Sequence, residues 1–126
     1  ADTPAAAINQ YHTQANGWAG IGYHVWIRKS GLCEVGRPLW AVGAHAKNHN
    51  HHSWGVCLDG NFDVHPPEPI QLEVLQTVLC YFELLSPGYK LVGHKELTGM
   101  QTTCPGKLFP MTWLREQMRS QLGREV

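Results

Sequence analysis

The sequence predicts a mixed α/β domain in which helices pack on a single small β-sheet. Segments with helical and with strand periodicity follow one another in the order α-β-β-β-α-β-α. The chain has 126 residues, a length that one hydrophobic core can serve. Hydrophobic residues make up 43% and charged residues 16%, which excludes a disordered chain or a coiled coil. We therefore expect residues 1–126 to form one domain.

The first half of the chain predicts one helix followed by three strands. Thr3 offers a capping hydroxyl and Pro4 suits the first helical position, so a helix is expected to begin there and to end at Asn16-Gly17. Apolar residues at alternate positions between turn residues then predict strands. These expected elements are a strand over 20–28, a hairpin turn over 29–31, a return strand over 32–36 and a third strand over 53–58.

The second half is dominated by one long apolar stripe. Apolar residues recur every three or four positions from Ile70 to Leu85 and predict a buried helix, which Ser86-Pro87-Gly88 ends. A short strand over 90–93 is expected to lead to His94. Residues 111–122 predict a final amphipathic helix.

Charge and hydropathy exclude several classes of partner. Ten Lys and Arg balance ten Asp and Glu, so no net field favours nucleic acid or an anionic membrane. No apolar stretch approaches the roughly 20 residues that span a bilayer, and the first residues lack the features of a signal peptide. We expect neither a nucleic-acid nor a membrane partner.

Histidine and cysteine are the residues that suggest chemistry, since the chain has eight His and four Cys. Cys57 and Cys80 sit in apolar runs and are interpreted as small core residues. His94 and Cys104 lie ten residues apart, at the end of an expected strand and in the loop after it. Imidazole nitrogen and thiolate sulfur are ligands that Zn²⁺ prefers, although this spacing alone is also that of two unrelated residues.

A series of short motifs carries a family resemblance. They are Gly17-Trp18-Ala19-Gly20-Ile21-Gly22-Tyr23-His24, Gly43-Ala44-His45-Ala46, Ser53-Trp54-Gly55-Val56, Val92-Gly93-His94 and Thr102-Thr103-Cys104-Pro105-Gly106. In this order they resemble the zinc-dependent N-acetylmuramoyl-L-alanine amidases, which include T7-lysozyme-type phage endolysins and peptidoglycan recognition proteins. The resemblance implies that family's fold and hydrolysis of the amide bond between N-acetylmuramic acid and L-alanine in peptidoglycan. The alternative is a recognition module that binds peptidoglycan without cutting it.

The resemblance also implies roles for individual residues. His94 and Cys104 match zinc ligands of the family, and Tyr23 matches the tyrosine beside the metal. Thr102 takes the place of a residue that steadies the oxyanion, so Tyr23 and Thr102 are the expected catalytic residues. Three positions match the substrate groove: Trp18, His45 and Asn50. The expected partner is peptidoglycan, acted on by a monomer at the bacterial cell wall, as by a phage lysin made in the host cytoplasm.

One departure from the family concerns its first zinc histidine, which ends an N-terminal strand just before the first helix. The chain starts at Ala1-Asp2-Thr3-Pro4, which resembles the stretch after that histidine. Three explanations remain open: a piece of a longer amidase, which we favour, a protein that has lost hydrolysis, or substitution by another His.

Two further residues have structural interpretations. His24 alternates with Tyr23 along the expected strand, so it faces away from the metal if Tyr23 faces it. Trp54 replaces an aliphatic residue of the family and is expected to fill the core.

Overall fold

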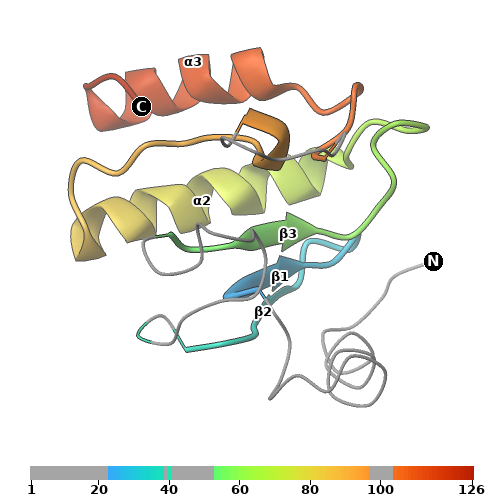
Figure 1. Cartoon of the computed structure of the whole chain (residues 1–126), viewed down its shortest axis with the longest axis horizontal. Helices are drawn as coiled ribbons and strands as arrows, with labels where there is room; N and C mark the ends of the chain where they lie inside the picture. Colours follow the sequence, from blue (N-terminus) through green and yellow to red (C-terminus); the bar gives the residue numbers. More distant parts are fainter. Residues whose placement is uncertain (1–22, 39, 41–52, 97–103) are drawn as a thin grey trace. The chain divides into compact units, whose positions relative to one another are not determined.

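The computed structural model describes residues 23–38, 40, 53–96 and 104–126 (Figure 1). The helix expected over 3–17 therefore lies outside the described residues. The chain divides into two compact units, residues 1–60 and residues 61–126, and each is treated by itself below. Strands in the first unit and helices in the second confirm the mixed α/β class. No described helix combines the length and the apolar character needed to cross a membrane.

The first unit contains a small mixed sheet with strand order β2-β1-β3. The strands are β1 (Val25–Ile27), β2 (Cys33–Val35) and β3 (Val56–Leu58). β1 pairs antiparallel with β2 and parallel with β3. The three predicted strands are thus confirmed, each shorter than the alternation of its residues suggested.

The hairpin between β1 and β2 forms where the turn was predicted. Arg28 donates its N–H to the carbonyl of Leu32 at 2.9 Å, and Gly31 donates to the carbonyl of Arg28 at 2.8 Å. Gly31 has φ +90°, a conformation that side chains with a Cβ rarely adopt. The turn sets the β1–β2 register, in which Ile27 lies opposite Cys33.

The central strand β1 is buried along its whole length. Val25, Trp26 and Ile27 are all 6% exposed or less, as befits a strand paired along both edges. Consecutive strand residues point to opposite faces, so both faces of β1 are covered. Trp54 is only half-buried, so the expectation that it fills the core was wrong.

Two helices form the second unit, α2 (Pro69–Leu85) and α3 (Met111–Leu122), together with the short 3₁₀ helix η3 (His94–Glu96). Both long helices were predicted. They run side by side in the same direction (Figure 1), with Gln121 of α3 bonded to both Gln76 and Cys80 of α2. Leu75, Leu79, Phe82, Leu114 and Met118 are the buried apolar residues of the two helices.

The first turn of α2 buries a polar residue for a structural reason. Gln71 is 1% exposed, and its side-chain oxygen accepts the N–H of Glu68 at 3.0 Å. This is the return half of a capping box, which satisfies a donor at the start of the helix. The buried apolar stripe of α2 is also shorter than predicted, because Ile70 and Leu85 at the two ends of the helix are 42% and 48% exposed.

The strand expected over 90–93 does not form. Residues 89–93 have no regular secondary structure and lead directly into η3. The reason is that side chains bind this segment's backbone: Leu91 accepts from the Arg115 guanidinium, and Gly93 donates to the Glu96 carboxylate.

All four cysteines are free. Cys57 is half-buried and packs against the core residue Trp26, as predicted, whereas Cys80 is half-buried on α2 and does not belong to the buried core. The Cys80 thiol donates to the side-chain oxygen of Gln121 at 3.2 Å, which is one contact between α2 and α3.

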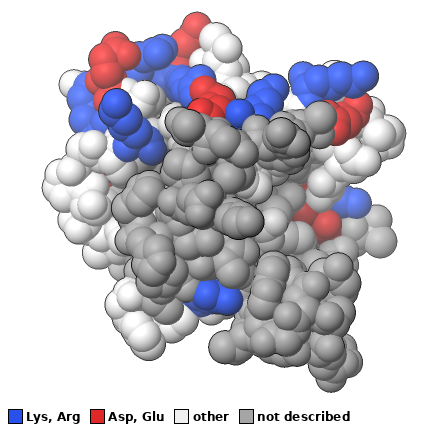
Figure 2. All heavy atoms as spheres, in the orientation of Figure 1, with Lys and Arg blue, Asp and Glu red and all other residues white. Residues whose placement is uncertain are grey.

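Charged side chains of both signs lie next to one another on the described surface in Figure 2. Three arginines on or just after α3 form ion pairs with carboxylates: Arg115 with Glu96, Arg119 with Glu125 and Arg124 with Glu83. The surface therefore mixes charges locally, in line with the zero net charge of the sequence.

Candidate metal centre

The second unit brings together the backbone segments that carry the two candidate zinc ligands. Lys95 donates its N–H to the carbonyl oxygen of Cys104 at 2.9 Å. His94 is therefore adjacent to a residue that is hydrogen-bonded to Cys104. His94 is half-buried and Cys104 is exposed, so both are within reach of solvent. A separation of ten residues in sequence is thus closed by one backbone hydrogen bond.

The segment that carries His94 is shaped by the carboxylate of Glu96. Gly93 donates its N–H to Glu96 Oε1 at 2.7 Å, while Glu96 donates its own N–H to the Gly93 carbonyl at 3.0 Å. The bond from the Gly93 N–H to the Glu96 side chain is one half of a capping box, in which Gly93 is the capping residue and Glu96 the third helical residue. His94 lies inside the closed turn as the first residue of η3.

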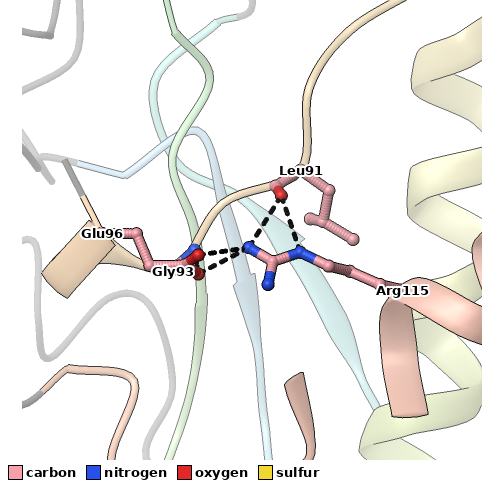
Figure 3. A network of polar contacts seen from close by, with 4 residues as sticks. All are labelled: Leu91, Gly93, Glu96 and Arg115. Atoms are coloured by element: carbon pink, nitrogen blue, oxygen red, sulfur yellow. Dashed lines mark hydrogen bonds and ion pairs between the residues drawn. The ribbon is translucent and has the colours of Figure 1, made fainter. Parts of the chain in front are cut away.

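Arg115 of α3 binds the same turn (Figure 3). Its Nη2 lies 2.6 Å from each oxygen of the Glu96 carboxylate, and its Nε and Nη2 each lie 3.3 Å from the Leu91 carbonyl. Ionised hydrogen bonds of this kind are the stronger class in proteins. Partial burial of Glu96 acts to raise its pKa, but the bonds from Arg115 and Gly93 outweigh it and leave the pKa below its ordinary value.

The segment after Cys104 is held by a close backbone approach. The Cys104–Pro105 peptide bond is cis. Gly106 has φ +110°, and a Cβ at this position would lie 2.5 Å from the carbonyl carbon of Phe62. Lys107 donates its N–H to a side-chain oxygen of Asp63 at 3.0 Å. Glycine is therefore the residue that this contact requires.

Gly93 and Pro105 link the two halves of the candidate centre. A Cβ at Gly93 would lie 3.0 Å from Cδ of Pro105 and 3.1 Å from Oε1 of Glu96. The residues before His94 and after Cys104 are therefore in close contact, which adds a second link to the Lys95–Cys104 hydrogen bond.

The donor chemistry of this pair fits zinc. Partial burial of the thiol, and next the Asp63 carboxylate, raise the pKa of Cys104 in the protein without metal. A coordinated divalent cation reverses that balance and favours the thiolate. Catalytic zinc sites use three protein ligands. The part of the chain that the structure describes contains no cluster of three or more His, Cys, Asp or Glu able to hold a metal.

The other predicted site residues are distributed as follows. Tyr23 belongs to the first unit, is half-buried just before β1, and stacks on Trp26 with ring centroids 6.3 Å apart. The remaining predicted residues lie outside the described part of the chain: Trp18, His45, Asn50 and Thr102.

His24 has the structural role that was predicted. It is 0% exposed, and its Nδ1 accepts the N–H of Gly55 at 3.0 Å. His24 also donates its backbone N–H to the Gly55 carbonyl at 2.9 Å. The imidazole therefore joins the start of β1 to the residue before β3.

Two residues beside the centre were missed by the sequence reasoning. Glu96 could have been found, because a glutamate three residues after a capping position is the capping-box spacing. Arg115 carries no such signal, since its partners lie 19 and 24 residues away in the sequence.

Comparison with known proteins identifies the class. Residues 1–107 match the family model described as N-acetylmuramoyl-L-alanine amidase. The chain therefore belongs to the N-acetylmuramoyl-L-alanine amidase family, as the motifs predicted.

The relatives in sequence include a phage endolysin and a mammalian amidase. The chain is 33% identical over 122 residues to an endolysin of Klebsiella phage KP32, covering 93% of this chain and 79% of the relative. It is 35% identical over 119 residues to an N-acetylmuramoyl-L-alanine amidase of Sus scrofa, covering 89% of this chain. It spans only 20% of that mammalian protein.

Solved structures confirm the amidase and peptidoglycan-recognition fold. The amidase LysC from Clostridium intestinale matches with a TM-score of 0.85 at 35% identity, over 98% of this chain and 78% of that one. Drosophila PGRP-LB matches with a TM-score of 0.78 at 28% identity, over 92% of this chain and 66% of that one.

Proposed function

We propose that this chain is the catalytic domain of a zinc-dependent amidase that hydrolyses the bond between N-acetylmuramic acid and L-alanine in bacterial peptidoglycan. Family membership supports the reaction. The observation that carries the metal assignment is the hydrogen bond from Lys95 to Cys104, because it places the His94 and Cys104 segments side by side.

In this proposal the imidazole of His94 and the thiolate of Cys104 hold zinc, together with a third protein ligand. When bound, zinc supplies a Lewis acid for the scissile carbonyl and lowers the pKa of water from about 15.7 towards 7. The chain's own residues do the rest. The Tyr23 hydroxyl donates a hydrogen bond to the attacking water or the developing oxyanion, and the Thr102 hydroxyl donates to the oxyanion.

Substrate binding is assigned to the groove positions of the family. Trp18, His45 and Asn50 offer an aromatic surface, an imidazole and an amide, which suit a ligand made of sugar and peptide. The substrate is peptidoglycan, so the protein acts on the bacterial cell wall.

The decisive experiment measures zinc content and amide cleavage in one preparation. Purified protein is incubated with peptidoglycan, and new L-alanine amino termini are counted, while elemental analysis gives zinc per chain. Cys104→Ser is expected to lose both. Cys33→Ser is the matched control, because Cys33 is also an exposed free cysteine but lies in β2. Cleavage retained by Cys104→Ser would refute the metal assignment.

A peptidoglycan-binding module is the second candidate, favoured by the likeness to the ectodomain complex of PGRP-LCa and PGRP-LCx, which was solved with tracheal cytotoxin bound and matches at 31% identity with a TM-score of 0.76. Sedimentation with insoluble peptidoglycan separates the two. Binding without release of amino termini, in protein that holds zinc, would identify the recognition module and exclude the amidase.

A further inference from the structure

We infer that Glu96 and Arg115 are positioning residues, which fix the backbone of the zinc ligand His94 from helix α3. The inference rests on the proposed function, because it concerns the same metal centre. Neither side chain is proposed to touch metal or substrate. Both act through the turn that contains His94 (Figure 3).

The first step of the argument is that anchors hold the backbone on both sides of His94. The residue before it, Gly93, donates its N–H to the Glu96 carboxylate at 2.7 Å. The residue after it, Lys95, donates its N–H to the Cys104 carbonyl at 2.9 Å. The backbone of His94 is therefore anchored to Glu96 through the preceding residue and to Cys104 through the following residue.

The second step is that Arg115 connects this turn to a long helix. Its guanidinium binds Leu91, which precedes His94, and Glu96, which follows it. The side chains of Arg115 and Glu96 are 23% and 35% exposed, so the pair is partly shielded from solvent. One rigid fork thus spans the His94 segment and ties it to α3.

The third step is that regular secondary structure gives the His94 segment little support. Residues 89–93 form no strand, and η3 has only three residues. Metal ligation requires ligand distances correct to about 0.2 Å. A metal ligand on an irregular segment needs side-chain anchors to hold these distances, and Glu96 and Arg115 provide such anchors.

The second unit contains a matched control. Glu83 accepts two bonds from Arg124, at 2.6 and 2.9 Å, and also accepts the N–H of Gly88 at 2.8 Å. This arrangement has the same groups as the Glu96–Arg115 pair, namely a carboxylate, an arginine and a glycine N–H, although Arg124 uses two nitrogens where Arg115 uses Nη2 alone. The side chains of both pairs are similarly shielded from solvent. Glu83 lies in α2, however, and its partners Arg124 and Gly88 are not hydrogen-bonded to the described residues 91–96, so this pair serves as a control.

The test compares the two pairs for stability and for affinity towards Zn²⁺. Four variants are made: Glu96→Ala, Arg115→Met, Glu83→Ala and Arg124→Met. Urea unfolding gives the stability of each, and competition with a chromophoric chelator gives the zinc affinity of the folded protein. Glu96→Ala and Arg115→Met are expected to weaken zinc binding by about 10- to 100-fold, the usual effect of losing a partner that orients a ligand. The Glu83 and Arg124 variants are expected to lose stability but keep the wild-type zinc affinity.

A conservative variant covers the case in which Glu96→Ala does not fold. Glu96→Gln keeps an oxygen that can accept the Gly93 N–H but loses the charge, so its zinc affinity should lie between those of wild type and Arg115→Met.

The outcomes separate this inference from the proposed function. Zinc affinity that falls equally in both pairs would show a general effect of stability and overturn the inference. Unchanged affinity in Glu96→Gln and Arg115→Met, with binding abolished in Cys104→Ser, would overturn it while the metal site stands. A wild-type protein that binds no zinc would refute the metal site and the positioning role together.

Discussion

Replacing Gly106 by alanine should be among the most damaging small changes in this protein. Gly106 has φ +110°, where a residue with a Cβ is strained by about 1–3 kcal/mol. The new Cβ would also lie 2.5 Å from the Phe62 carbonyl carbon and 2.7 Å from its oxygen, so the backbone must move. Overpacking of this kind costs about 1–3 kcal/mol. The expected loss is therefore about 2–6 kcal/mol, a large part of the roughly 5–15 kcal/mol typical of a domain.

Gly88→Ala provides the control for backbone strain. Gly88 has φ +86°, but nothing lies within 4 Å of the position that its Cβ would take. Both substitutions gain similarly from the reduced freedom of the unfolded chain. The difference between the two variants therefore isolates the contact with Phe62, at about 1–3 kcal/mol.

Urea unfolding followed by circular dichroism measures this difference. With a slope of about 1–3 kcal/mol per molar urea, a difference near 2 kcal/mol separates the two midpoints by about 1 M. Equal midpoints for Gly106→Ala and Gly88→Ala would refute the argument that the contact with Phe62 requires glycine.

Three further predictions concern individual hydrogen bonds. His24→Phe should destabilise the protein by about 1–3 kcal/mol in thermal unfolding, because it leaves the buried Gly55 N–H without its imidazole acceptor; an unchanged melting temperature would contradict the structural role. Burial, then the Glu83 charge, raise the pKa of Tyr89 to about 12, so Tyr89→Phe should remove a phenol that ionises near pH 12 in an ultraviolet titration. The same variant loses the bond to the Leu79 carbonyl and about 1 kcal/mol of stability. Hydrogen bonds from its arginine partner lower the pKa of Glu83 below its ordinary 4.5, so the stability lost in Glu83→Gln should be largest above pH 4.5. That difference should shrink as the pH falls through the lowered pKa, and a difference independent of pH would argue against the ion pair.

The elements that the sequence predicted correctly are those specified by local interactions. The hairpin needs only a turn that Gly31 can adopt, and α2 needs an apolar face together with the break at Pro87-Gly88. The mistakes fall where distant side chains decide. The segment 90–93 has strand-like residues, but Arg115 and Glu96 occupy its backbone groups, so no strand forms.

The candidate site shows the same division. His94 and Cys104 were predicted as ligands because of motifs around each of them, and a spacing of ten residues could not show that they meet. Their proximity depends on the Lys95–Cys104 hydrogen bond, which no periodicity predicts. The position of Glu96 is local and was predictable, whereas that of Arg115 is set by the packing of the second unit.

The anchoring of the His94 segment is consistent with the proposal that this irregular segment carries a metal ligand. In a strand, the backbone groups at Leu91, Gly93 and Lys95 would bind a neighbouring strand. Here they bind a guanidinium, a carboxylate and the carbonyl of Cys104. The last of these partners belongs to the other proposed ligand, Cys104, so one backbone hydrogen bond connects the two segments. A change that loosens the His94 turn is therefore expected to reach the backbone of Cys104 through this bond.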